Sequence, residues 1–251
     1  MRRLLSLAIG LALAAPACTG DGGANGSPSP SVVPTATTPS DMASPDPTST
    51  SAPRPIPPAW AEPIEQDLDP AAITDERLVP PGATLTARVV LAEGGGLPEQ
   101  VVVAYVVGSD PFAAEHGVAV WERFPDPPAW SVVLAYVDKP AAEVLGIRLQ
   151  TGDLTGDLHE DVLAFEDMGG TGGCGRWRVL AASAAGTETV FQEQTCDTQV
   201  SIVGETLEVR GAIFEPEDPH CCPSAFRTST LEWDGQGFTE TSSRVDDAPS
   251  G

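Results

Sequence analysis

The 251-residue sequence predicts an all-β fold of stacked β-sheet units that follows a disordered N-terminal linker. From about residue 60, short clusters of Val, Leu, Ile and aromatic residues are separated by Gly, Pro and Asp, which is typical of short strands joined by turns. The order of these clusters recurs after roughly 60 residues, as in repeat architectures. Helical periodicity is limited to residues 70–78 and 139–145.

Residues 1–17 have the pattern of a secretory signal. Arg2 and Arg3 form a positive start, and an apolar run from Leu4 to Ala15 follows. This run is shorter than the roughly 20 residues that a membrane-spanning helix needs. We therefore expect export of the chain and removal of the signal.

The segment Ala15-Pro16-Ala17-Cys18 resembles the cleavage box of bacterial lipoproteins, in which small residues precede a cysteine that receives diacylglycerol. The resemblance implies that Cys18 is lipidated and that the mature protein is anchored on the outer, extracytoplasmic face of the cell membrane. The alternative is ordinary signal cleavage, which leaves Cys18 as a thiol.

Residues 18–59 are expected to form a disordered tether. They consist mainly of Ser, Thr, Pro, Gly and Ala, and so cannot bury enough apolar surface to offset chain entropy. The whole chain has 13 Lys and Arg against 36 Asp and Glu, a formal net charge of −23. This charge excludes a nucleic-acid partner, because no basic surface is available for phosphates. It also means that lipid, not charge, must provide the membrane attachment.

The β-domain is expected over residues 60–243, with a disordered tail at 244–251. Each predicted strand is a short run rich in β-branched or aromatic residues between turn residues. In chain order, the predicted strands are 84–91, 100–107, 117–123, 131–137, 146–150, 161–166, 176–182, 188–192, 200–203, 206–210, 229–233 and 237–241.

Two stretches of about 60 residues within this domain resemble each other. In each, an acidic loop is followed by a strand, a Gly-rich turn, a strand, a turn and a strand. This order is typical of stacked units such as propeller blades. Two or three units cannot close a propeller ring, so we expect an open assembly or a sandwich. The aligned stretches are 97–105 with 158–166, 117–121 with 175–180, and 130–138 with 187–197.

The loop 153–161 carries an oxygen ligand at every second position. Side-chain oxygens occupy positions 1, 3, 5 and 9, and a backbone carbonyl is available at position 7. Ca²⁺ prefers about six to eight oxygen ligands of this kind. The equivalent loop of the first unit, 92–100, lacks them. The expected calcium ligands are Asp153, Thr155, Asp157, His159 and Asp161.

This loop resembles the calcium loop of FG-GAP and VCBS repeat proteins, which runs Asp-x-Asn/Asp-Gly-Asp-Gly-x-x-Asp into a hydrophobic strand. Those families carry such loops in β-propellers and related β-domains, often for adhesion or extracellular binding, so the resemblance implies Ca²⁺ and a binding role. Thr155 and Leu158 depart from the pattern, and Leu158 stands where the family has a left-handed glycine. The alternative is an Asp/Gly turn that no longer holds a metal.

Four cysteines remain after Cys18, and an even number in an exported domain indicates disulfides. We favour a Cys174–Cys196 bond with Cys221–Cys222 as a vicinal pair, and a crossed pairing is the alternative. A metal site at His220, Cys221 and Cys222 is less favoured because their spacing is not that of a zinc site.

The chain resembles lipoproteins of high-GC Gram-positive bacteria in residues 218–224 followed by 227–235, in the Gly-Asp-x-Thr-Gly-Asp loop at 152–157 and in the Gly-Gly-Cys-Gly stretch at 172–175. The resemblance spans about residues 147–238 and implies no particular activity.

Catalytic motifs do not stand out in the sequence. The three His have no zinc-hydrolase spacing, and no Gly-x-Ser-x-Gly motif occurs. Acid pairs such as Glu160/Asp161 and Glu215/Glu217 suit glycoside hydrolysis but are expected by chance among 36 acids. We expect no enzyme but a binding domain for a cell-wall, carbohydrate or protein ligand. The alternatives are a structural calcium- and disulfide-stabilised envelope module and an extracellular hydrolase. An exposed aromatic patch including Trp121 and Trp130 would favour a carbohydrate or protein ligand.

Overall fold

The structure is a computed structural model that describes residues 58–110, 113–138, 144–170, 173–184, 186–219 and 222–248. These residues belong to the second of two compact units, Ser51–Gly251. The predicted signal, Cys18 and nearly all of the predicted linker lie outside the described residues. Within the described ranges, no helix is both long and apolar enough to cross a membrane.

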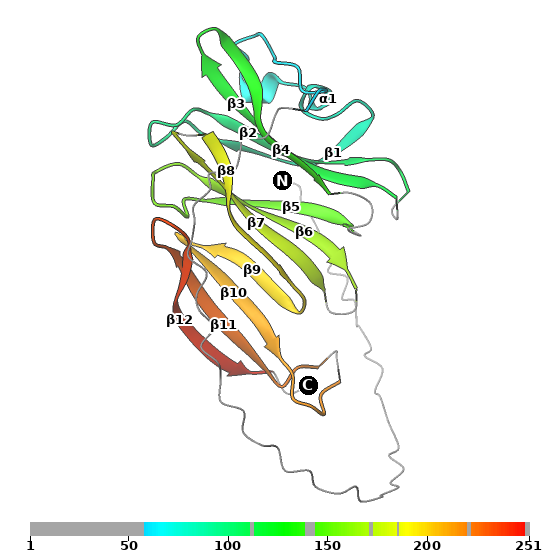
Figure 1. Cartoon of the computed structure of the whole chain (residues 1–251), viewed down its shortest axis with the longest axis vertical. Helices are drawn as coiled ribbons and strands as arrows, with labels where there is room; N and C mark the ends of the chain where they lie inside the picture. The colour runs from blue at the N-terminus through cyan, green and yellow to red at the C-terminus, as the bar shows by residue number, and fades with distance from the viewer. Residues whose placement is uncertain are drawn as a thin grey trace, which may run out of the picture. The chain divides into compact units, whose positions relative to one another are not determined.

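The described strands form three four-stranded antiparallel sheets, and strands adjacent in the chain are neighbours in each sheet (Figure 1). The all-β prediction is confirmed, and each predicted strand overlaps an observed one. The first sheet contains β1 (Ala83–Leu91), β2 (Gln100–Val107), β3 (Glu115–Pro125) and β4 (Pro128–Asp138). The second contains β5 (Gly146–Gly152), β6 (Asp161–Gly169), β7 (Cys174–Ser183) and β8 (Gly186–Thr195). The third contains β9 (Thr198–Val203), β10 (Thr206–Ile213), β11 (Ala225–Trp233) and β12 (Phe238–Asp247).

The sheets pack face against face, which explains the nearly continuous apolar runs of their central strands. On β2, Val102 and Ala104 pack against Val162 and Ala164 of β6 in a core between the first two sheets. The alternate residues of β2, such as Val103, face a second core on the opposite side of the first sheet. Because side chains alternate between faces, a strand covered on both sides needs apolar residues at almost every position.

A segment before β1 covers the outer face of the first sheet. It contains a 3-10 turn, η1 (Pro70–Ala72), which the side chain of Asp69 caps, and a short helix, α1 (Asp75–Leu78). Trp121 and Trp130 are fully buried beneath it, and their indole N–H groups donate to the carbonyl oxygens of Leu78 and Leu68 at 3.0 and 3.1 Å. The suggestion of an exposed aromatic patch with these two tryptophans is therefore wrong, because the covering segment removes both from solvent.

The third sheet packs its inner face on the second sheet, where Val200 and Leu207 meet Leu163, Phe165 and Trp177. Its edge strand β12 is exposed along nearly its whole length. This strand continues to Asp247, beyond the domain end predicted at 243. The sequence alignment found only two units, and its aligned stretches fall on the second, third and fourth strands of the first two sheets.

Candidate functional site

The loop predicted to bind calcium connects β5 to β6, and its first carboxylate organises the turn. One oxygen of Asp153 accepts the backbone N–H groups of Gly156 and Asp157 at 2.8 and 3.2 Å, and the other accepts that of Leu158 at 3.1 Å. A short acidic side chain commonly caps successive backbone donors in this way. Asp153 therefore stabilises the loop through three backbone hydrogen bonds.

Asp161, the last predicted ligand, closes the loop from the start of β6. Its Oδ2 accepts the backbone N–H groups of Leu154 and Thr155, both at 2.8 Å, and the Thr155 hydroxyl at 3.1 Å. The side chain is almost completely buried. Burial raises the pKa of Asp161 to about 6, although the hydrogen bonds from Thr155 and Leu154 act in the opposite direction. A nearby cation would offset the cost of this buried charge.

The middle of the loop contains the residues that depart from the family pattern. Leu158 has a φ of 69°, so it adopts the left-handed conformation that the family gives to glycine, and its side chain is 81% exposed. Asp157 accepts the backbone N–H of His159 through Oδ1 at 2.9 Å. The His159 ring is buried, with Nδ1 3.0 Å from the Glu160 carbonyl oxygen and Nε2 3.3 Å from that of Pro98.

The acidic loop packs tightly against the glycine loop, which we define as residues 92–99 between β1 and β2. A Cβ atom placed on Gly94 would lie 2.5 Å from the carbonyl oxygen of Leu158, and one on Gly95 would lie 2.2 Å from that of Asp157. Neither position can carry a side chain without displacing backbone. The corresponding loops of the first two sheets are therefore in direct contact, and the hydrogen-bonding contact between His159 and Pro98 reinforces it.

The structure thus brings the five predicted calcium ligands into one loop. The three carboxylates of this loop, however, accept hydrogen bonds from backbone N–H groups. No group of three His, Cys, Asp or Glu side chains in the described ranges is close enough to hold a metal. The donor types and the left-handed turn at Leu158 still suit Ca²⁺. The calcium site stays a prediction.

A hollow of about 560 Å³ lies beside the glycine loop, which lines part of it. Its walls come from this loop, from the end of β3, from the start of β4 and from Asp67 of the covering segment. Phe124 contributes an aromatic ring that is 40% exposed. The remaining lining residues are Glu93, Gly96, Leu97, Pro98, Glu99, Glu122, Arg123, Pro125 and Pro128.

The hollow is acidic, with four carboxylates and one guanidinium. Arg123 forms ion pairs with Asp67 and with Glu99, the latter at 3.3 Å, so its charge is already matched within the wall. Glu122 accepts a hydrogen bond from the buried Gln100 at 3.0 Å. Gln100 also donates to Thr187 of β8, which ties this wall to the second sheet. The hollow is therefore built from connected side chains and favours a positively charged ligand.

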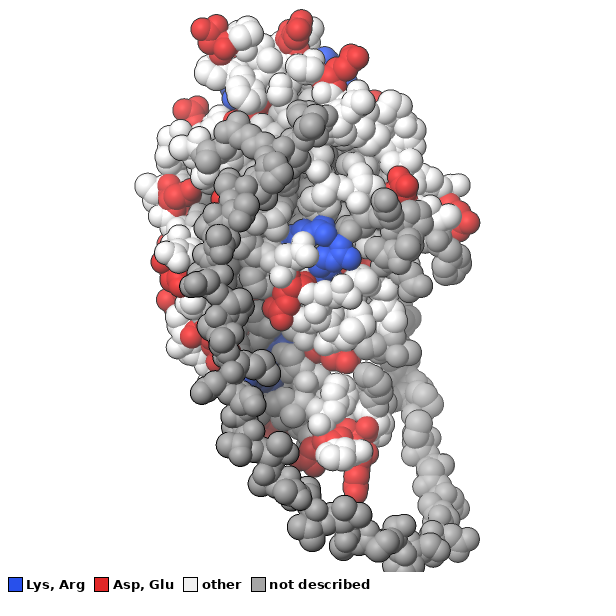
Figure 2. Space-filling model, in the orientation of Figure 1, with Lys and Arg blue, Asp and Glu red and all other residues white. Residues whose placement is uncertain are grey.

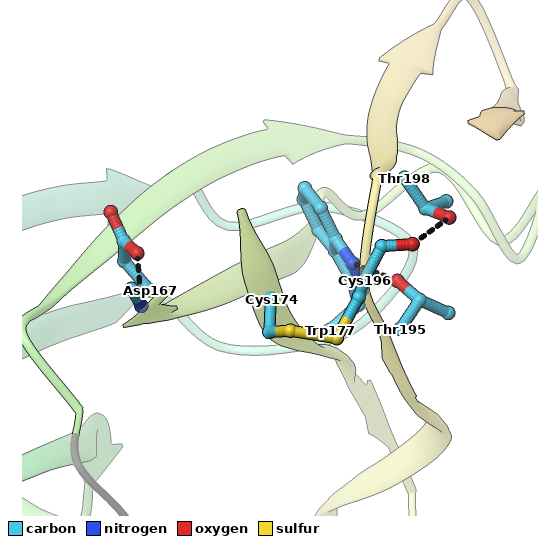
Figure 3. The surroundings of a disulfide bond; sticks show 7 residues. Asp167, Cys174, Trp177, Thr195, Cys196 and Thr198 are labelled. Carbon is cyan, nitrogen blue, oxygen red and sulfur yellow. Dashed lines mark hydrogen bonds between the residues drawn. A yellow bond between two sulfur atoms is a disulfide. The ribbon is translucent and has the colours of Figure 1, made fainter. Parts of the chain in front are cut away.

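The predicted Cys174–Cys196 disulfide is confirmed (Figure 3). Cys174 begins β7, and Cys196 lies in the short connection from β8 to β9. Beside the bond, the Trp177 indole N–H donates to the Thr195 hydroxyl at 3.2 Å. The disulfide therefore fastens the point where the chain passes from the second sheet to the third.

The second predicted disulfide lies partly outside the described residues, because His220 and Cys221 are not among them. Cys222 is described and exposed. The vicinal pair therefore stays a prediction.

The two acid pairs named in the sequence analysis differ in their burial. Asp161 is buried, whereas Glu160 is exposed and accepts a hydrogen bond from Thr151 at 3.4 Å. Glu215 and Glu217 are both exposed. On the face shown in Figure 2, acidic side chains are scattered widely and outnumber basic ones, in line with the net charge of −23.

Sequence reasoning missed the glycine loop and Phe124 as site residues. The run Gly94-Gly95-Gly96 was a usable signal, because consecutive glycines often permit close backbone approach. Comparison of the chain with protein-family models, curated proteins and solved structures found no match.

Proposed function

We propose that the protein is a non-catalytic binding domain of the cell envelope, anchored through lipid on Cys18, and that the acidic hollow is its ligand site. One observation carries the proposal: the acidic loop packs directly on the glycine loop that lines the hollow. Calcium bound to the acidic loop would therefore hold one wall of the site. The acidic loop would then contribute to ligand binding, because it supports the glycine loop, as well as to the stability of the fold.

The lining of the hollow indicates the chemistry of the ligand. Glu93, Glu99, Glu122 and Asp67 attract positive charge, and the exposed ring of Phe124 offers a flat apolar contact. An amino-sugar chain combines both features, because it has ammonium groups and sugar faces that pack on aromatic rings. We therefore assign the hollow to a glycan with free amino groups.

The fold and the family resemblance are consistent with this role. The three sheets have the strand order of consecutive propeller blades, and we place them as an open array of such blades. The FG-GAP- and VCBS-like loop belongs to the second of them and packs on the glycine loop of the first. A tethered domain of this kind suits attachment to surface polymers outside the membrane.

Glucosamine oligosaccharides test the ligand, with their N-acetylated forms as uncharged controls. The mature chain with Cys18→Ser should bind only the oligomers with free amines. Glu93→Gln and Phe124→Ala should each weaken binding, whereas Glu205→Gln, an exposed position outside the hollow, should not. Equal binding of both oligomer types, or of neither, would reject the hollow as an amino-sugar site.

Calcium titration tests the role of the loop. Affinity is expected in the range of extracellular modules, on the order of 10⁻⁴–10⁻³ M. Millimolar Ca²⁺ should raise the melting temperature because the ion binds only the folded chain. Asp157→Asn, which keeps an oxygen for the His159 N–H, should remove that rise. If calcium changes neither melting nor oligosaccharide binding, the Asp/Gly-turn interpretation holds. If it changes melting alone, the structural-module alternative is favoured.

Metabolic labelling tests the anchor. A palmitate analogue should label the wild-type chain in cells and not the Cys18→Ala variant. Equal labelling of both would contradict lipidation at this residue.

A further inference from the structure

A second, smaller pocket of about 230 Å³ lies where β5 of the second sheet meets β9 of the third. Its floor is apolar and consists of Leu163, Phe165 and Trp177. Phe165 and Trp177 are directly paired across β6 and β7, and their ring centroids are 4.0 Å apart. The floor therefore consists of two tilted aromatic rings and Leu163, all largely buried in the core between the second and third sheets.

The rim of this pocket is polar. Arg148 and Gln150 lie two residues apart on β5, so they project from the same face, and Gln199 and Ser201 come from β9. The Gln150 side-chain oxygen accepts the backbone N–H of Ile202 at 3.3 Å, which joins the two sheets beside the pocket. Amide and hydroxyl groups on such a rim both donate and accept hydrogen bonds, as sugar hydroxyls require.

Arg148 places a positive charge at this rim, and no ion pair with it is found among the described residues. Its guanidinium carbon lies 4.5 Å from the centroid of the Phe165 ring. Within the described part of the chain, no carboxylate lies within salt-bridge distance of it, whereas Arg88, Arg123 and Arg227 all have acidic partners. In a chain of net charge −23, an exposed arginine without such a partner can still receive an anion.

A hydrogen bond and a disulfide fix the residues next to the floor of the pocket. Trp177 donates to Thr195, and the adjacent Cys174–Cys196 disulfide fixes the passage from β8 to β9 (Figure 3). These contacts fix the floor and the start of β9, and the hydrogen bond from Ile202 to Gln150 joins the β9 and β5 walls before a ligand arrives. Such preorganisation reduces the entropy lost on binding.

We infer that this pocket binds one sugar unit that carries a carboxylate, such as a uronic acid. The volume is below the roughly 300 Å³ at which drug-sized sites begin, which limits the ligand to a small unit. Arg148 receives the carboxylate, the rim amides and hydroxyl bond the sugar hydroxyls, and the largely buried aromatic floor closes the base of the pocket. The inference is independent of the acidic hollow, which favours the opposite charge.

Titration with glucuronate, followed by NMR of the Trp177 indole N–H, tests the pocket in the mature Cys18→Ser chain. Glucose and acetate are the controls, since each supplies only half of the recognised chemistry. Glucuronate should shift the indole signal in the millimolar range, and each control should bind at least about tenfold more weakly. Amino-sugar oligomers should leave this signal unchanged, which separates the result from that of the hollow.

Matched arginine variants complete the test. Arg148→Gln should lower glucuronate affinity about tenfold or more, because it removes a charge-assisted contact. Arg210→Gln is the control, since Arg210 also lies over a phenyl ring, that of Phe226, but lines no part of this pocket. Gln199→Ala removes a rim amide without touching the Arg148–Phe165 stack and should also weaken binding.

Three outcomes would overturn the inference. They are unchanged affinity in folded Arg148→Gln, glucose or acetate binding as tightly as glucuronate, and no indole shift at up to roughly 50 mM glucuronate, well above the millimolar range.

Discussion

Asp161→Asn should stabilise the calcium-free domain at neutral pH, although it removes a carboxylate that accepts three hydrogen bonds. The side chain is buried at the start of β6, and its pKa is raised from the ordinary 3.8 to about 6. Its Oδ2 accepts the N–H groups of Leu154 and Thr155. The amide oxygen of asparagine can take that place, so the substitution removes the buried charge and keeps these bonds.

The magnitude follows from the two pKa values. Each pH unit between them corresponds to about 1.4 kcal/mol, so the charge costs up to roughly 3 kcal/mol at pH 7. Between about pH 4 and 6 the folded state binds this proton more strongly than the unfolded state does. The contribution of Asp161 to stability is therefore fully present below about pH 4 and is lost as pH rises through 6.

The measurement is thermal unfolding of wild type and Asp161→Asn in EDTA from pH 4 to pH 8. At pH 7 the variant should melt roughly 5–10 °C higher, and the difference should disappear toward pH 4. Asp234→Asn is the control. Asp234 is exposed, and its pKa is lowered by backbone N–H bonds from Gln236 and Gly237, so its replacement should not stabilise the domain at pH 7.

Calcium should reverse the ranking, because the ion needs the carboxylate that the variant lacks. A variant that is less stable than wild type by the same amount at every pH in EDTA would refute the reasoning. That result would mean that the hydrogen bonds to Asp161 outweigh the cost of burying its charge.

Three further predictions concern stability. Replacing Cys174 and Cys196 together by Ser should lower the free energy of unfolding by roughly 3 kcal/mol, because the bond closes a loop with a sequence separation of 22, and denaturant unfolding measures this loss. Leu158→Gly should raise the free energy of unfolding by roughly 0.5–1 kcal/mol in the same assay, since relief of the left-handed strain exceeds the added chain entropy; a destabilised variant would contradict this. Burial raises the pKa of Tyr105 to about 12, so the unfolded chain releases this proton first and stability should fall as pH rises from 10 to 12. Tyr105→Phe should abolish that part of the alkaline loss, and an unchanged pH profile would exclude Tyr105 as its source.

Local sequence patterns were sufficient to predict the strands and one disulfide bond. Strand length, β-branched content and turn residues are properties of neighbouring positions, so the run from Gln100 to Val107 was predicted with its observed bounds. The Cys174–Cys196 bond was favoured because its cysteines follow a Gly-rich turn and a strand of the same unit, and antiparallel pairing places them opposite each other. The family pattern has a left-handed glycine at the position of Leu158, and the structure shows that Leu158 adopts this conformation.

Only the tertiary structure determined which surfaces of the sheets and loops are exposed to solvent and which are buried. The local sequence did not show that the segment before β1 buries Trp121 and Trp130. The three consecutive glycines indicated a close backbone approach but not that its partners are Asp157 and Leu158. These contacts join residues far apart in the chain, and they depend on how sheets stack.

The small pocket at Arg148 arises in the same way, because β5 and β9 each contribute part of its rim. Side-chain alternation specifies which residues share a face of a strand, whereas only the packing of one sheet on another determines whether that face becomes core, loop contact or binding site.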